Sequence, residues 1–139
     1  MNKRAKTVSF EVPSSTAEIA KVIHTLENFL NSVDCCTEPV GEVTLAASEA
    51  VTNAIIHGNK KDVQKKIFIT FRKTASELSV IIEDQGDGFE PDKIPNPMTP
   101  KNRMKTTGRG IYLMKAVVDK VIFNRKKSGM QVKLIKYLN

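Results

Sequence analysis

Cysteine is nearly absent from this sequence of 139 residues, and the two that occur, Cys35 and Cys36, are neighbours in the chain. Adjacent cysteines cannot easily reach ordinary disulfide geometry, and no third cysteine exists to help build a zinc site. Long apolar runs are also absent, although 40% of the residues are hydrophobic, so no membrane-spanning helix is expected. The basic opening residues lead into no apolar signal core. These absences favour a cytoplasmic protein with reduced thiols, folded as one domain over residues 1–139.

Aromatic residues are scarce, at 6% of the sequence, and acidic residues are scarce in its last third. Residues 93–139 contain 12 basic side chains and only Asp119 as an acidic one, whereas the preceding residues contain 10 basic and 14 acidic side chains. This asymmetry favours a polyanionic ligand or an acidic partner. Because few rings are available to stack on bases, direct binding of nucleic acid is not expected.

Alternation of apolar and polar residues predicts five half-buried strands. They are expected at 7–12, 66–73, 78–83, 118–124 and 129–138. Helical periodicity predicts one amphipathic helix that begins at a capping box of Ser15 and Glu18, and another that runs from Pro39 to Gly58. After Gly58, Asn59 and the charged residues that follow it are expected to form an exposed loop.

The helix expected at 39–58 carries three polar residues, Glu49, Asn53 and His57, along one stripe. A carboxylate and a carboxamide one turn apart suit the roles of a base and a metal ligand. The alternative is that these residues form the solvated face of an amphipathic helix. For His57, packing or capping at the helix end is at least as good an interpretation as catalysis.

A loop with two glycines follows the strand at 78–83, in the order Asp84, Gly86 and Gly88. It does not fit a calcium loop, because the third position is Gly86 and the twelfth is Pro95, where ligands are required. A plain turn is one interpretation. The other is a ligand site, because an acidic side chain followed by bare backbone lets a flat ligand approach closely.

Residues 89–109 form a long, basic segment that contains several prolines, which predicts a lid over a functional site. The segment ends in a glycine pair, Gly108 and Gly110, that opens a helix. Helix starts with exposed backbone amides bind phosphate well, although such a pair can also be a simple hinge. Neither common phosphate motif is present, since Leu113 stands where GxGxxG needs its third glycine.

Three of these stretches resemble the N, G1 and G2 boxes of the GHKL ATPase superfamily. They are EAVTNAIIHG at 49–58, DQGDG at 84–88 and TGRG at 107–110. The first and last, read with their neighbours as EAVTNAIIHGN and TGRGIYLM, are similar more narrowly to the bacterial anti-sigma-factor serine/threonine kinases. The resemblance covers nearly the whole chain. It implies an α/β fold, a two-layer sandwich of GHKL (Bergerat) type with helices packed on one face of a mixed, mostly antiparallel sheet.

The resemblance also implies a site for ATP and Mg²⁺. Asn53 would coordinate the Mg²⁺ ion that bridges the phosphates, and Glu49 would act as the general base. Asp84 would accept a hydrogen bond from the adenine amino group. The remaining matching residues would contact the nucleotide, at the base or at the phosphates: His57, Gly86, Gly88, Thr107, Gly108, Arg109 and Gly110.

The implied activity is that of an ATP-dependent serine/threonine protein kinase that acts as an anti-sigma factor. The partners would be an anti-anti-sigma (STAS-type) protein, which is phosphorylated, and a sigma factor, which is sequestered; a homodimer is a further family expectation. A histidine-kinase module is disfavoured, because it normally follows a dimerisation helix pair for which this sequence leaves no room. The alternatives are a nucleotide-gated protein-binding regulator without kinase activity and a basic nucleic-acid-binding domain with vestigial boxes.

Overall fold

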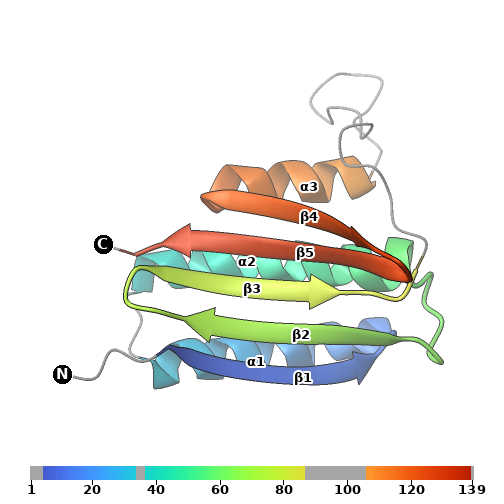
Figure 1. Ribbon diagram of the computed structural model, residues 1–139, viewed down its shortest axis with the longest axis horizontal. Coiled ribbons are helices and arrows are strands. Elements are labelled where there is room, and N and C mark those ends of the chain that lie inside the picture. The colour runs from blue at the N-terminus through green and yellow to red at the C-terminus, as the bar shows by residue number, and fades with distance from the viewer. Residues whose placement is uncertain (1–4, 34–36, 87–105, 139) are drawn as a thin grey trace.

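All five predicted strands are present in a computed structural model, which describes residues 5–33, 37–86 and 106–138, with the backbone alone at 37–40 and 106–108. In sheet order they are β1 (Lys6–Pro13), β2 (Lys66–Lys73), β3 (Glu77–Glu83), β5 (Gly129–Tyr137) and β4 (Lys120–Lys126). The four pairings between these strands are all antiparallel, and Figure 1 shows them side by side. Residues 87–105, which hold Gly88 and most of the predicted lid, lie outside the described part of the chain.

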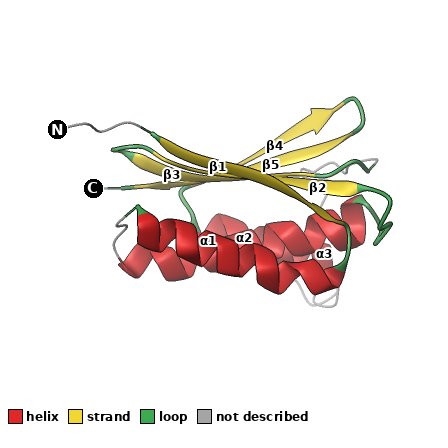
Figure 2. Ribbon diagram, turned by 90° about the horizontal axis from the view of Figure 1, so that it is seen from below, coloured by secondary structure: helices red, strands yellow, loops and turns green. Residues whose placement is uncertain are grey.

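Three helices form the second layer: α1 (Ile19–Ser32), α2 (Thr37–Asn53) and α3 (Thr106–Val117). Figure 2 shows all three on the same face of the sheet, which confirms the predicted two-layer α/β sandwich. Residues 106–109, which were predicted to end the lid, belong instead to the first turn of α3. Among the described helices, none combines the length and the apolar character needed to cross a membrane.

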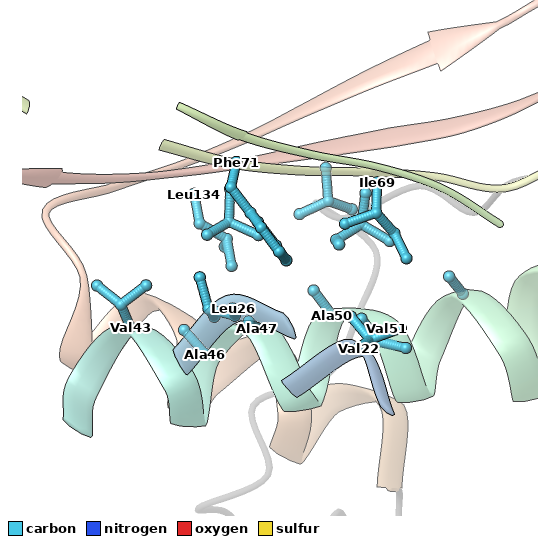
Figure 3. Close-up of a cluster of buried hydrophobic side chains, with 14 of the residues drawn as sticks. Val22, Leu26, Val43, Ala46, Ala47, Ala50, Val51, Ile69, Phe71 and Leu134 are labelled. Carbon is cyan, nitrogen blue, oxygen red and sulfur yellow. The ribbon is translucent and has the colours of Figure 1, made fainter. Parts of the chain in front are cut away.

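The hydrophobic core lies between the two layers, because alternate residues of the strands point toward the helices. In β2, for example, Ile67, Ile69 and Phe71 are buried. Helix α2 meets them with small side chains, Ala46, Ala47 and Ala50, which Figure 3 shows beneath the sheet. Small residues let a helix approach a sheet closely. The close packing holds α2 against the sheet and so fixes the position of the polar residues near its end.

Both predicted helices begin or end differently from the prediction. Ser15 caps a short 3₁₀ turn, η1 (Thr16–Glu18), by accepting a hydrogen bond from the Ala17 N–H at 3.3 Å, and α1 starts only after it. The helix predicted to reach Gly58 is α-helical only to Asn53 and ends in a π-helical turn, η2 (Ala54–Gly58). There the Asn59 N–H donates to the Ala54 carbonyl oxygen at 2.8 Å. Single π turns of this kind are frequent at functional sites.

The prediction of an exposed loop after Gly58 is wrong for Asn59, whose side chain is 1% exposed. Its Nδ2 donates to the Lys66 carbonyl oxygen at 3.0 Å, and its Oδ1 accepts from the Gln85 N–H at 2.7 Å. These bonds tie the end of η2 to the start of β2 and to the loop after β3. The exposed part of the loop starts at Lys60, beyond this anchored residue.

The strand predicted at 118–124 begins instead at Lys120. The reason is that the Val118 N–H still donates to the Met114 carbonyl oxygen of α3, at 3.1 Å. Val118 therefore continues the helical hydrogen bonding, and its apolar side chain is buried in the core instead of in a strand.

Candidate functional site

Two polar side chains near the end of α2, Glu49 and Asn53, lie against Gly110, which directly follows the first turn of α3. A methyl group added at Gly110 would stand 3.0 Å from Glu49 Oε2 and 3.2 Å from Asn53 Nδ2. The absence of a side chain at residue 110 lets the backbone of α3 lie this close without moving either polar group. The structure thus brings Glu49 and Asn53 of the predicted stripe together with Gly110 of the predicted glycine pair. About 60 residues separate them in the sequence.

Asn53 is 6% exposed, and its Nδ2 atom has no hydrogen-bond partner within the described part of the chain. Leaving a buried polar group unpaired costs about 1–3 kcal/mol. A half-turn of the amide would present the oxygen, an acceptor or metal ligand, at the same point. The end of α2 therefore holds a polar group that fits a ligand beside Glu49 and Gly110.

Asp84 directly follows β3 and is 5% exposed. Its Oδ1 accepts two backbone hydrogen bonds, from the Gly86 N–H at 2.9 Å and from the Met130 N–H at 3.2 Å. Burial raises the pKa of this carboxyl, and the two hydrogen bonds oppose that rise. The result is a fixed acceptor in a poorly solvated position, suited to a single hydrogen-bond donor of a ligand.

The surroundings of Asp84 are packed backbone against backbone. A Cβ atom at Gly58 would meet the Asp84 carboxylate, and one at Gly86 would collide with the carbonyl oxygen of Gly58. Gly129 has φ +152°, and a Cβ there would collide with the Asp84 carbonyl oxygen. The π turn, the loop after β3 and the start of β5 therefore meet around one carboxylate.

The other predicted site residues are placed less specifically. His57 lies in η2 and is largely exposed. The part of its side chain that is buried lowers the pKa of the imidazole. Thr107, Gly108 and Arg109 belong to the first turn of α3, with the Arg109 side chain exposed. Gly88 falls in the undescribed stretch. The described geometry therefore forms two clusters. One contains Glu49, Asn53 and Gly110, the other contains Asp84 and Gly86, and η2 connects the two.

The sequence analysis missed three residues of this arrangement: Gly58, Asn59 and Gly129. Gly58 was interpreted only as a helix end, and Asn59 as part of a loop. An asparagine directly after a helix-ending glycine could have been recognised as a buried cap. No local pattern identifies Gly129, because its importance comes from contact with Asp84, 45 residues earlier in the sequence.

Comparison with known proteins decides between the interpretations of this geometry. The family described as "Histidine kinase-like ATPase domain" matches residues 12–136. The chain belongs to this family. The predicted membership of the GHKL ATPase superfamily is confirmed, and the family is one of ATPase domains.

Two curated relatives are similar over most of the chain. The serine-protein kinase RsbW of Bacillus subtilis is 30% identical over 145 residues, which cover 100% of this chain and 90% of the relative. The anti-sigma F factor of Clostridium perfringens strain SM101 is 32% identical over 114 residues, which cover 80% and 81%. These similarities confirm the narrower predicted resemblance to anti-sigma-factor kinases.

Solved structures support the fold. The RsbU and RsbW domains of Rv1364c from Mycobacterium tuberculosis superpose with a TM-score of 0.71 at 16% identity, over 94% of this chain and 32% of that longer one. The catalytic domain of the histidine kinase ThkA superposes with a TM-score of 0.57 at 14% identity, over 95% of both chains. At these identities the likeness shows the fold alone.

Proposed function

We propose that this chain is an ATP-dependent serine/threonine protein kinase that acts as an anti-sigma factor. It phosphorylates an anti-anti-sigma protein of the STAS type and otherwise sequesters a sigma factor. Relatives named as a serine-protein kinase and as an anti-sigma factor support the proposal. The observation that carries it in this chain is the placement of a carboxylate and an unpartnered amide, Glu49 and Asn53, beside Gly110 of α3.

Asp84 recognises the adenine ring in this proposal. Its carboxylate accepts a hydrogen bond from the exocyclic amino group, while the Gly86 and Met130 N–H groups hold Oδ1 in place. Gly86, together with Gly88, lets the flat ring approach the backbone. His57 borders the nucleotide from the exposed end of η2.

The phosphates of ATP occupy the space between the end of α2 and the start of α3. Backbone amides at the start of a helix and a guanidinium are good ligands for phosphate oxygens, so Thr107, Gly108, Arg109 and Gly110 hold the triphosphate. The Asn53 side chain supplies an oxygen ligand for Mg²⁺, which fits its unpartnered amide. When bound, Mg²⁺ neutralises charge on the phosphates.

Glu49 acts as the general base. It is half-buried one helical turn before Asn53, with Oε2 directed toward Gly110. The substrate hydroxyl oxygen attacks the γ-phosphorus, its proton passes to the Glu49 carboxylate, and ADP leaves. Phosphoryl transfer depends mainly on positioning and charge neutralisation, so one base and a set of phosphate ligands cover the protein's part of the chemistry.

The test is incubation of the purified chain with γ-labelled ATP and candidate STAS-type proteins. We expect acid-stable phosphoserine or phosphothreonine on the partner, and much less of it at limiting ATP when the Asp84→Asn chain replaces the parent. Acid-labile phosphohistidine would indicate a histidine kinase instead. Binding of ATP without any transfer to a partner would contradict the kinase proposal and favour a nucleotide-gated regulator.

A further inference from the structure

A basic edge of the sheet lies apart from the nucleotide site. Strand β4 is an outer strand, and within the described chain it pairs only with β5. Figure 2 shows this hairpin twisted away from the helical layer, so the outer edge of β4 faces away from the core. Residues 120–128, which form β4 and the turn after it, contain four cations and no acidic residue: Lys120, Arg125, Lys126 and Lys127.

Acidic groups near this edge are already engaged. Asp119 Oδ2 accepts from the Tyr137 N–H at 2.6 Å. Glu83 accepts from Gln131 Nε2 at 3.1 Å and lies 4.0 Å from Lys126 Nζ. The side chains of Lys120 and Lys127 are exposed. The edge therefore presents a positive field that few of its own carboxylates offset.

A hollow of about 310 Å³ adjoins the start of β4. Its lining is half apolar, from Val118, Val121 and Ile122, and half charged, from Lys115, Asp119 and Lys120. Ile122 is 37% exposed, so part of its apolar side chain is open to a partner. The hollow is large enough for one branched side chain of a partner.

We propose that β4 is a docking edge for an acidic, extended segment of a partner protein. The segment adds a strand to β4, places its carboxylates against Lys120 and Lys127, and inserts one apolar side chain into the hollow. Lysines on an outer strand also prevent pairing with a second copy, because that copy presents the same positive charges. The same cations admit an acidic strand, so the edge selects its partner by charge. This goes beyond the proposed kinase activity and does not depend on it.

The favoured partner is a polypeptide and not a nucleic acid. An unpaired strand edge offers backbone hydrogen bonds that match another strand, and the hollow fits a side chain. A nucleic acid would need stacking platforms in addition to cations. Residues 115–128, which line the hollow and form the edge, contain one ring, that of Phe123, and it is half-buried on the core side. Beside them, the exposed ring of Tyr137 lies 6.0 Å from Lys120 Nζ and offers a single stacking face, which is less than the row of rings that a nucleic acid needs.

The test uses peptides of seven residues, which is the length of β4. The intact chain is titrated, by NMR, with the peptides EVELEVE, QVQLQVQ and EVESEVE and with oligothymidylate. We expect the acidic peptide to shift the amide signals of residues 120–126. Replacing its leucine by serine should weaken binding about tenfold, the effect of burying one such side chain.

A double charge reversal, Lys120→Glu with Lys127→Glu, should weaken binding of EVELEVE about tenfold or more, because two attractions between opposite charges become repulsions between like charges. Lys6→Glu with Lys21→Glu is the matched control, because it changes the net charge equally at exposed positions on β1 and α1. ATP affinity should be unchanged in both. No binding of EVELEVE, equal binding of QVQLQVQ, equal binding to the reversed variant, or tighter binding of oligothymidylate on β4 would each overturn the proposal.

Discussion

Asp84 is a carboxylate that is 5% exposed, and both of its hydrogen bonds from described residues end on Oδ1. Burying a charge with incomplete compensation is costly. In the proposed function, the other oxygen, Oδ2, is the acceptor for adenine. That role would explain a residue that stability alone would not favour.

Replacing Asp84 by Asn should weaken ATP binding about 10- to 100-fold. Asparagine keeps an oxygen for the Gly86 and Met130 N–H groups but turns Oδ2 into an amide donor that faces the donor of adenine. Losing one charge-assisted hydrogen bond costs about 1.5–3 kcal/mol. Calorimetric titration with a non-hydrolysable ATP analogue measures the loss, and Glu27→Gln on the exposed side of α1 serves as the control. Equal affinity in the Asp84→Asn chain would mean that Asp84 does not bind adenine.

The same substitution should stabilise the chain without nucleotide at neutral pH. Burial raises the pKa of Asp84 in the folded state, so the folded state holds this proton more tightly than the unfolded state. The associated stability is present below the unfolded-state pKa, near 3.9, and is lost as pH rises through the folded-state pKa. The melting temperature of Asp84→Asn minus that of the parent should therefore grow with pH across this window. A melting-temperature difference that does not change with pH would contradict a raised pKa of Asp84 in the folded state.

At the scale of elements, the contact of α2 with α3 determines the end of the site where we propose that the phosphates bind. The motifs in the sequence predict that α2 and α3 carry residues of one site, because each motif lies at a recognisable end of a helix or strand. The π turn η2 could not be predicted in this way. Its geometry depends on Asn59, whose hydrogen bonds reach Lys66 and Gln85 in other elements, and such tertiary contacts leave no local periodicity.

Gly110→Ala should lower ATP affinity about tenfold or more while the chain stays folded. The added methyl group would stand 3.0 Å from Glu49 Oε2 and 3.2 Å from Asn53 Nδ2, so it displaces both groups from the phosphate region. Gly41→Ala in α2 is a matched control, because a methyl group there meets nothing within 4 Å. It should raise stability by about 0.5–1 kcal/mol through helix propensity and leave ATP affinity unchanged. Parent-like ATP affinity in Gly110→Ala would contradict the assigned phosphate region.

At the scale of the whole molecule, local patterns predict the sheet only in part. The β2–β3 and β4–β5 hairpins follow from short turns between alternating segments. The β1–β2 and β3–β5 pairings join segments that are far apart in the sequence, and no residue pattern specifies which edge each strand takes. The side of the sheet that the helices cover is predictable, because the apolar residues of each strand fall on one face.

Charge is also distributed over the whole molecule. The proposed nucleotide site lies where α2, α3, β3 and β5 meet, whereas the excess of cations in residues 93–139 extends along β4 at the edge of the sheet. ATP is anionic, and so is the partner inferred for β4. A basic chain can thus serve two anionic ligands at separate surfaces.

The central claim, that the site transfers a phosphoryl group and does not only bind ATP, is tested most directly by Glu49→Gln. Glutamine keeps the size of the side chain but removes the carboxylate that receives the hydroxyl proton. ATP affinity and single-turnover transfer to a phosphorylatable STAS-type partner are measured on the same protein, with Glu27→Gln on the exposed side of α1 as the control. We predict nearly unchanged affinity and transfer slowed about 10²- to 10⁴-fold. Transfer at the parent rate with unchanged affinity would show that Glu49 is not the base and would contradict the account.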